Sequence, residues 1–571
     1  AVSLPMSSIY VIPQEIENPY DAAGLVAALL GVNEAHLSEA MTSTKSFTWV
    51  KRYVTPVERD QVMGLGIKGI YFLKEYERFY PKLNLASHVI GFTGMDSRGL
   101  EGLEFKYNEH LMNSDIHNET WNPLVHDPRV NPLSGGSIEL TIDATLQHLV
   151  DTEISKATQG MKAKFGVAIL MDSQTSEILS LSAWPNYDPN NFQRYNKQNF
   201  FNNSVGLAYE PGSTFKLVTM ATALESGAIA KDNLFYCEKG TYQIHDREIH
   251  DTHPYGFLSL EQIIQKSSNI CAAKIAQLID RPTFYQSIQK FGFGQKTDLG
   301  LGGEVSGKLH HFGNWNEITV ATLSYGHSIS ATPIQVLAAT NVFANGGKWV
   351  QPKIIKSLKK ADGTVIPIPK QRRVDVVSPE VATQVKDYMK SVVKLGGTGF
   401  KAHTDGLEIA GKTGTTRKFD SQLGAYSNSL HTSSFVGFFP ADKPRLTLFV
   451  LVDEPSQRYL GSKSASVVFK MIVNKVKNYY PLEGPEHYPA TQEKTPFATG
   501  AQTAALAGEQ TGGAQEKLTT SELTRKVIGK SLREALAFAS THEMNIKLKG
   551  NGKVAQAEIN KNTLTLTLSD D

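Results

Sequence analysis

The chain has 571 residues, a formal net charge of +2 and two cysteines. A chain of this length is too long for one ordinary hydrophobic core, so we expect about three domains. The nearly balanced charge, with no basic block, gives no electrostatic indication of binding to nucleic acid or to an acidic polymer. Two cysteines are too few for a disulfide scaffold, and we expect Cys237 and Cys271 to be reduced or buried thiols.

The first predicted domain covers residues 1–134 and mixes short helical patterns with extended pieces. It ends in a turn-rich stretch, Asn131-Pro132-Leu133-Ser134-Gly135-Gly136, which is a good domain boundary. After this boundary, residues 138–143 alternate apolar and polar types as a strand does, and a helical pattern runs over residues 145–157.

The second predicted domain covers residues 135–484 and has β-rich runs near both ends, with helix-rich sequence between them. The four runs cover residues 165–172, 177–183, 433–439 and 445–452. Strands at both ends of a segment with helices in the middle indicate an α+β domain whose sheet is closed by pieces that are distant in the sequence.

The remaining sequence predicts a linker and a small third domain. Residues 485–518 are rich in Ala, Thr, Gly and Gln with few large apolar side chains, as in a flexible linker. Within residues 519–571, an amphipathic helix over 531–539 precedes three alternating strands. These strands cover residues 546–548, 554–559 and 564–568. A helix on three strands is about the minimum for a separate core.

Three short motifs in the α+β segment point to chemistry. In chain order they are Ser213-Thr214-Phe215-Lys216, Ser267-Ser268-Asn269 and Lys412-Thr413-Gly414-Thr415. Together they form the signature of a serine acyl-enzyme that opens amides or β-lactam rings. The first pattern alone is weak, because residues 357–360 and 391–394 match it too. Ser213 differs in its flank, since Pro211 and Gly212 punctuate the chain before it and a helical run follows.

The first two motifs supply a nucleophile and its base. A serine at the first turn of a helix has Lys216 one turn further on, on the same face and within reach of the Ser213 hydroxyl. A lysine serves as the base only when its pKa falls towards neutrality, which burial and a nearby cation such as Lys412 achieve. We expect Ser267 to relay protons, and Asn269 to hold the substrate and the lysine ammonium.

The third motif is predicted to be an edge strand that binds the substrate. Its backbone would pair with an extended peptide, and the ammonium of Lys412 would attract a carboxylate that Thr413 also holds. Gly414 leaves room for a close approach of backbone. The backbone N–H groups of Ser213 and Thr415 would form the oxyanion hole, where each donor is typically worth about 3–4 kcal/mol.

With their flanks, residues 209–216 and 411–415, these motifs resemble a penicillin-binding protein transpeptidase. The likeness continues at residues 266–276, 291–294, 324–333 and 434–440. Upstream, residues 80–81, 88–92 and 99–104 resemble the pedestal domain of the monofunctional, class B members. The resemblance thus covers nearly the whole chain. It implies an antiparallel sheet flanked by helices, with the active site between the sheet and a helical lobe.

The resemblance also implies a D,D-transpeptidase reaction. Ser213 would attack the carbonyl before the terminal D-Ala of a peptidoglycan stem peptide, and the amine of a neighbouring stem would capture the acyl-enzyme. β-Lactams would mimic the donor and stop at a slowly hydrolysed ester on Ser213. No metal or organic cofactor is implied. No glycosyltransferase region is present in the sequence, so glycan polymerisation would come from elsewhere.

Among class B proteins, the pedestal and tail resemble the division transpeptidase FtsI and its sporulation relatives more than the elongation enzyme. The implied partners are an FtsW-like membrane glycosyltransferase and division proteins.

No stretch approaches the ~20 apolar residues that a spanning helix needs. Relatives carry a membrane helix before the point where this sequence starts, so we expect an extracytoplasmic ectodomain at the cell membrane.

The last predicted domain resembles a single PASTA domain. The likeness rests on residues 527–536 and 550–554, and the motif is short. PASTA domains are associated with binding of cell wall or of partner proteins. An appendage that packs on the main domain is an equal alternative.

Two other site patterns compete with the acyl-enzyme. Residues 406–413 satisfy the phosphate-loop pattern, but the four variable positions are strand-like and the sequence after Thr413 is no helix start, which argues against an NTPase. His245, His250 and His253 lie close to Cys237 and Asp251, types that bind zinc. Their spacing matches no closed zinc site, and solvated or loop-stabilising histidines are the favoured interpretation.

Two further alternatives have the same fold but a different function. A β-lactamase or β-lactam sensor shares the three motifs, but a hydrolase needs a base for the deacylating water. No Glu-x-x-Asn candidate stands between the second and third motifs, and the large pedestal fits a transpeptidase better. A non-catalytic wall-binding scaffold is the last alternative, and the intact nucleophile, base and third motif count against it.

Overall fold

The computed structural model describes residues 1–112, 135–420, 425–456 and 463–482, and residues 545–549, 553–560 and 563–569 near the C-terminus. The chain divides into two compact units, Ala1–Tyr488 and Pro489–Asp571. The predicted boundary at residue 134, the linker at 485–518 and the helix at 531–539 lie outside the described residues. The four-part domain division therefore stays a prediction.

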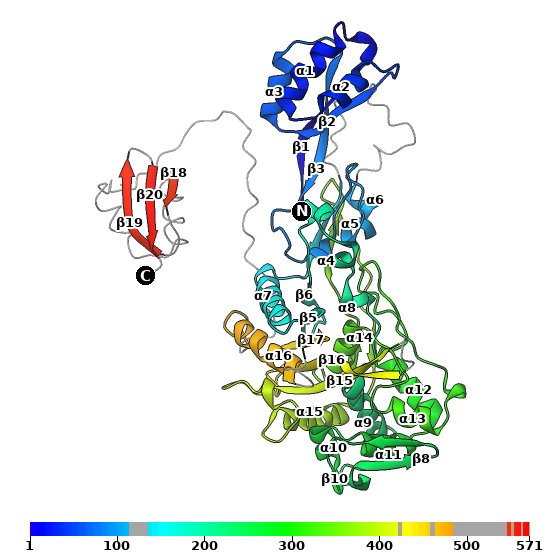
Figure 1. Cartoon of the computed structure of the whole chain (residues 1–571). Helices are drawn as coiled ribbons and strands as arrows, with labels where there is room; N and C mark the ends of the chain where they lie inside the picture. The colour runs from blue at the N-terminus through cyan, green and yellow to red at the C-terminus, as the bar shows by residue number, and fades with distance from the viewer. Residues whose placement is uncertain are drawn as a thin grey trace. The chain divides into compact units, whose positions relative to one another are not determined.

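The N-terminal region contains a three-stranded antiparallel sheet, in the order β2-β1-β3, with its first three helices packed on it (Figure 1). Its elements are β1 (Val2–Val11), α1 (Pro19–Leu30), α2 (Glu34–Met41), β2 (Thr48–Val54), α3 (Pro56–Gly64), β3 (Ile70–Phe79), α4 (Ser87–Ile90), α5 (Gly102–Lys106) and α6 (Asn108–Leu111). The helix ends follow local sequence rules: Pro19 opens α1, Gly31 closes it in the left-handed conformation, and Thr55 with Glu58 forms a capping box on α3.

The central sheet has five antiparallel strands in the order β15-β16-β17-β5-β6. They are β5 (Phe165–Asp172), β6 (Ile178–Trp184), β15 (Ala410–Asp420), β16 (Ala425–Phe439) and β17 (Leu446–Asp453). Both predicted strand pairs are confirmed, and β17 pairs with β5 across a long stretch of sequence. The expected antiparallel sheet closed by distant pieces is therefore present.

Helices cover both faces of this sheet (Figure 1). On one face lie α7 (Ala144–Gly160) and α16 (Lys463–Val476), and on the other lie α8 (Asn203–Gly206), α14 (Pro333–Asn341) and α15 (Pro379–Val393). The helical lobe beyond them adds α9 (Lys216–Glu225), α10 (Leu260–Lys266), α11 (Asn269–Gln277), α12 (Arg281–Lys290) and α13 (Glu317–Leu323). Alternate residues of β5 enter different cores: Ala168 and Leu170 pack with α7 and α16, whereas Val167 and Ile169 pack towards the helical lobe. The strand is therefore apolar on both faces.

The main domain also contains short strands outside the central sheet. They are β4 (Ser137–Leu140), β7 (Leu234–Tyr236), β8 (Thr241–Ile244), β9 (Arg247–His250), β10 (Phe257–Ser259), β11 (Lys348–Val350), β12 (Ile355–Lys359), β13 (Val365–Ile366) and β14 (Arg373–Asp375). The strand predicted at residues 138–143 corresponds to β4. It pairs with β12 in a small separate sheet and does not join the central one.

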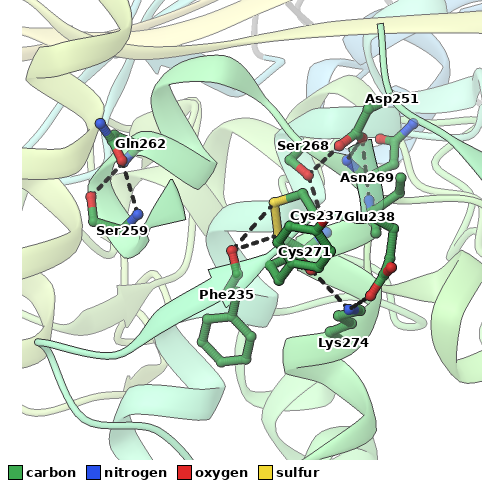
Figure 2. Close-up of a disulfide and its surroundings, with 12 residues drawn as sticks. Phe235, Cys237, Glu238, Asp251, Ser259, Gln262, Ser268, Asn269, Cys271 and Lys274 are labelled. Atoms are coloured by element: carbon green, nitrogen blue, oxygen red, sulfur yellow. Dashed lines mark hydrogen bonds and ion pairs between the residues drawn. A yellow bond between two sulfur atoms is a disulfide. The ribbon is translucent and has the colours of Figure 1, made fainter. Parts of the chain in front are cut away.

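Cys237 and Cys271 form a disulfide, so the prediction of two thiols is wrong (Figure 2). Cys237 directly follows β7, and Cys271 lies in the first turn of α11. Their Cα atoms are 5.2 Å apart although 34 positions separate them in the sequence. Such a pairing depends on the approach of the two segments in space, which the spacing of two cysteines does not reveal.

The C-terminal unit contains β18 (Asn545–Lys549), β19 (Lys553–Asn560) and β20 (Thr563–Ser569). They form a sheet in the order β18-β20-β19, with β18 parallel and β19 antiparallel to β20. The three predicted strands are confirmed.

Among the residues described in either unit, no helix has the length and apolar character to span a membrane.

Candidate active site

Ser213 lies in a tight 3-10 turn, η5 (Gly212–Phe215), that runs directly into α9. The chain enters the turn through Gly212 at φ +59°, and a Cβ there would lie 2.7 Å from Thr416 Oγ1. Glycine is therefore required on both counts. The Gly212 N–H donates to the carbonyl of Gly326 at 3.2 Å, which fixes the turn against the loop after α13. The Ser213 side chain stays partly exposed.

Lys216, at the start of α9, is 1% exposed and donates to groups of the first two motifs. Its Nζ lies 3.0 Å from Ser213 Oγ, 2.6 Å from the carbonyl oxygen of Ser267, 3.1 Å from Ser267 Oγ and 2.7 Å from Asn269 Oδ1. Burial lowers the pKa of Lys216 to about 7, while the negative charge of Asp251 opposes this change. Near neutral pH the lysine is therefore neutral in a large fraction of molecules.

The second motif forms the junction between α10 and α11. Ser267 ends α10 in the left-handed conformation at φ 61°, which is uncommon for a residue with a side chain. Ser268 then caps α11, because its hydroxyl accepts the N–H of Cys271 at 3.1 Å. Asn269 is the first residue of α11. The sharp reversal at Ser267 lets both its hydroxyl and the Asn269 amide face Lys216.

The third motif lies in β15, which is an edge strand of the central sheet as predicted. Lys412 is fully buried, and its Nζ donates to Ser267 Oγ at 2.9 Å. Burial and then the charge of Lys216 hold the pKa of Lys412 well below its usual range. Thr413 Oγ1 donates to Thr398 Oγ1 at 3.0 Å. The Ser267 hydroxyl thus stands between the two lysines.

The sequence predicted that Gly414 leaves room for a close approach of backbone. The structure shows such an approach, but by the backbone of this chain at Pro211. A Cβ on Gly414 would lie 2.3 Å from Ser434 Oγ and 3.1 Å from the Pro211 carbonyl oxygen. Thr416 Oγ1 also donates to the carbonyl of Glu210 at 2.9 Å. These contacts place β15 against the turn that carries Ser213. The oxyanion hole of the Ser213 and Thr415 N–H groups stays a prediction.

The histidines of the alternative zinc pattern take other partners. His245 contacts Glu317 at 2.9 Å, and the His250 ring lies 3.3 Å from Glu248. In the part of the chain that the structure describes, no group of three or more His, Cys, Asp or Glu side chains has a metal-binding arrangement. The phosphate-loop pattern at residues 406–413 leads into β15, where a phosphate loop would lead into a helix.

Sequence reasoning missed two contributors to the site. Asp251, considered there only as a metal ligand, hydrogen-bonds to the second motif. Glu210, just before the η5 turn, contacts the ring of His327 at 3.2 Å and the Tyr426 hydroxyl at 3.1 Å. Neither residue lies in a motif. The only available signal was the position of Glu210 next to Pro211 and Gly212.

The sequence pattern of the penicillin-binding protein transpeptidase domain matches residues 166–474, which contain all three motifs. The chain belongs to the penicillin-binding protein transpeptidase family. It is 32% identical to "Probable peptidoglycan D,D-transpeptidase PenA" of Neisseria gonorrhoeae over 508 residues, covering 87% of this chain and 85% of the relative. It is 31% identical to peptidoglycan D,D-transpeptidase FtsI of Escherichia coli K12, covering 90% and 86%.

A solved structure supports the same assignment. The crystal structure of penicillin-binding protein 3 from Mycobacterium tuberculosis, complexed with aztreonam, aligns with a TM-score of 0.64 at 27% identity. The alignment covers 72% of this chain and 92% of that one. The chain is therefore a transpeptidase of cell-wall synthesis with the penicillin-binding transpeptidase fold, and neither the β-lactamase nor the scaffold alternative is favoured.

Proposed function

We propose that this chain cross-links peptidoglycan stem peptides through an acyl-enzyme on Ser213, with Lys216 as the base. The observation that carries the proposal is the contact of 3.0 Å between Lys216 Nζ and Ser213 Oγ, made by a lysine whose burial lowers its pKa to about 7. A base with a pKa near the working pH combines a useful neutral fraction with sufficient proton affinity.

In the acylation step, neutral Lys216 accepts the Ser213 proton while Oγ attacks the carbonyl before the terminal D-Ala. The backbone N–H groups of Ser213 and Thr415 stabilise the oxyanion that forms. The amide C–N bond then breaks, and the D-Ala amine leaves with the proton that Lys216 took from Ser213, delivered through Ser267. The hydrogen bonds of Ser267 Oγ to both lysines support this relay.

In the second step, the amine of a neighbouring stem attacks the ester carbonyl on Ser213. The amine loses a proton to neutral Lys216, the ester C–O bond breaks, and Lys216 returns that proton to Ser213 Oγ. Lys412 and Thr413 hold the donor carboxylate, while β15 pairs with the donor backbone. Gly414 has no side chain and so leaves room for the donor backbone to approach the strand. Asn269 holds the substrate and the lysine ammonium. A β-lactam acylates Ser213 by the same first step.

The cellular setting follows from the class B relatives. We infer a role at cell division, with the catalytic domain outside the cytoplasm and an FtsW-like membrane glycosyltransferase and division proteins as partners. The E. coli relative, named FtsI, supports this inference. We also propose that the C-terminal unit is a PASTA-like domain, supported by the three strands described there.

Intact-mass spectrometry after incubation with benzylpenicillin tests the function, with Ser213→Ala as the matched variant. We expect one stable adduct of the drug's mass on the wild-type chain and none on S213A. Consumption of the drug without an adduct would indicate a β-lactamase. No adduct and no consumption would contradict an acyl-enzyme of any kind.

A further inference from the structure

The N-terminus of α11 is held by a carboxylate from a segment outside the motifs. Asp251 directly follows β9, and its Oδ1 accepts the N–H of Asn269 at 2.5 Å and that of Ile270 at 3.2 Å (Figure 2). Its Oδ2 accepts the Ser268 hydroxyl at 2.5 Å. An anion at a helix N-terminus that accepts backbone N–H groups gains both from the charged hydrogen bonds and from the helix dipole.

The residue before Asp251 fixes the Asn269 side chain. The His250 carbonyl accepts Asn269 Nδ2 at 3.0 Å, so the amide oxygen Oδ1 faces the other way, towards Lys216 Nζ at 2.7 Å. An amide held at its nitrogen cannot turn without losing one of the two hydrogen bonds. The pair His250 and Asp251 therefore sets both the backbone and the side chain of Asn269.

Capping α11 does not by itself require Asp251. Ser268 already serves as the N-cap through the Cys271 N–H. The same segment is also fastened to α11 by the Cys237–Cys271 disulfide and by the ion pair of Glu238 with Lys274 (Figure 2). The carboxylate thus adds a contact at the end of the helix that meets the catalytic lysine.

We propose that Asp251 is a positioning residue for the transpeptidase reaction, which fixes Ser267 and Asn269 against Lys216 through the N-terminus of α11. Because Ser267 directly precedes Ser268, the hydrogen bond of Ser268 to Asp251 restrains the left-handed turn that aims the Ser267 hydroxyl. The inference rests on the proposed function, since it assigns Asp251 to a site built around Ser213.

The charge of Asp251 gives the proposal a pH signature. Its anion raises the pKa of Lys216 against the effect of burial. Other titratable groups on the elements around this site include Lys412 on β15, His327 after α13, and His250 and Tyr255 on the segment of Asp251. Glu248 pairs with His250, and Glu238 pairs with Lys274 of α11. Replacement of Asp251 by Asn changes none of these residues, so a shift in the pH profile reports the lost carboxylate.

The test compares D251N, D251E and S268A in the full chain, by acylation with a chromogenic cephalosporin across the pH range in which each variant is folded. For D251N we expect a maximal acylation rate roughly 10–100-fold lower, as for misplaced catalytic groups. The midpoint of the rise with pH should move to lower pH. D251E should be slow with the midpoint near that of wild type, and S268A should be slow with the midpoint unchanged.

A wild-type rate and midpoint in D251N would overturn the proposal. A lower acylation rate in D251N with the pH midpoint of wild type would show that Asp251 only caps α11, and this would also overturn the proposal. Thermal unfolding reports whether each variant folds. If D251N does not fold, wild-type rates in both D251E and S268A would overturn the proposal. Failure of the proposed function is visible separately, as an adduct that survives in S213A.

Discussion

The Ser267 hydroxyl lies between the side-chain amines of two lysines, with Lys216 Nζ at 3.1 Å and Lys412 Nζ at 2.9 Å. Both lysines are buried, and burial favours the neutral form of each. Two protonated lysines sharing one hydroxyl would repel each other in a site of low dielectric constant. The arrangement therefore favours a neutral Lys216, which can act as the base, next to the Ser267 hydroxyl, which can relay protons. The proposed reaction depends on this pair of residues.

The pH dependence of acylation follows from this lysine. Lys216 accepts a proton only when neutral, and its pKa of about 7 means that the neutral form grows as pH rises through that value. We expect the second-order rate of acylation by benzylpenicillin to increase with pH, with a midpoint near 7. Stopped-flow or mass-spectrometric rates at a series of pH values measure it.

Lys216→Arg is the matched control for this profile. The guanidinium stays protonated at every accessible pH, so the variant should lose nearly all acylation and should show no rise with pH. An acylation rate in K216R that rises with pH as in wild type would assign the base to another residue.

At the scale of elements, the site depends on three segments that meet at one place. The turn η5, the junction of α10 with α11, and β15 contribute one motif each. The segment from Cys237 to Asp251 supports the second of these from outside, through the disulfide and the hydrogen bonds to α11. Stability and positioning of α11 are thus shared among several contacts.

Removal of the disulfide should lower stability more than activity. In the chain-entropy account, a crosslink over 34 residues stabilises the fold by about 3–4 kcal/mol, chiefly by restricting the unfolded chain. We expect the double variant Cys237→Ala/Cys271→Ala to lose about that free energy of unfolding in denaturant titrations. Its acylation rate should stay close to wild type, because Asp251 still holds α11.

Wild-type protein unfolded under reducing conditions is the control, and it should match the double variant. Equal stability of the oxidised wild type and the double variant would contradict a stabilising crosslink. A large loss of acylation with a normal melting temperature would assign the disulfide a direct part in the site.

At the scale of the whole molecule, the catalytic motifs and the C-terminal strands belong to different compact units. All three motifs lie within Ala1–Tyr488, and β18 to β20 lie within Pro489–Asp571. The central sheet, its helices and the N-terminal sheet all lie in the first unit. All the residues to which we assign a role in the proposed reaction therefore lie in the first unit.

A chain that ends at Tyr488 should keep the acylation rate and the melting temperature of the catalytic unit. The full-length chain is the control, and benzylpenicillin acylation with thermal unfolding provides both measurements. A marked fall in acylation on truncation would show that the C-terminal unit supports the active site.

The sequence predicted the elements whose pattern is local. The hairpin strands β5 and β6, the helix α7 and the three C-terminal strands follow from alternation and helical periodicity. The sequence also predicted that the three motifs form one site, because their order and residue types match those of a serine acyl-enzyme. The sheet of β4 escaped prediction, since a single alternating run does not specify its partner strand.

The sequence by itself determined which residues can perform the chemistry, because a hydroxyl, an amine and an amide have fixed reactivity wherever they lie. Only the tertiary structure decided how they act. The burial that lowers the pKa of Lys216, the left-handed turn at Ser267 and the approach of Asp251 to α11 all depend on distant segments. The disulfide is the same kind of feature, since contact in space, and not spacing along the chain, allows two thiols to pair.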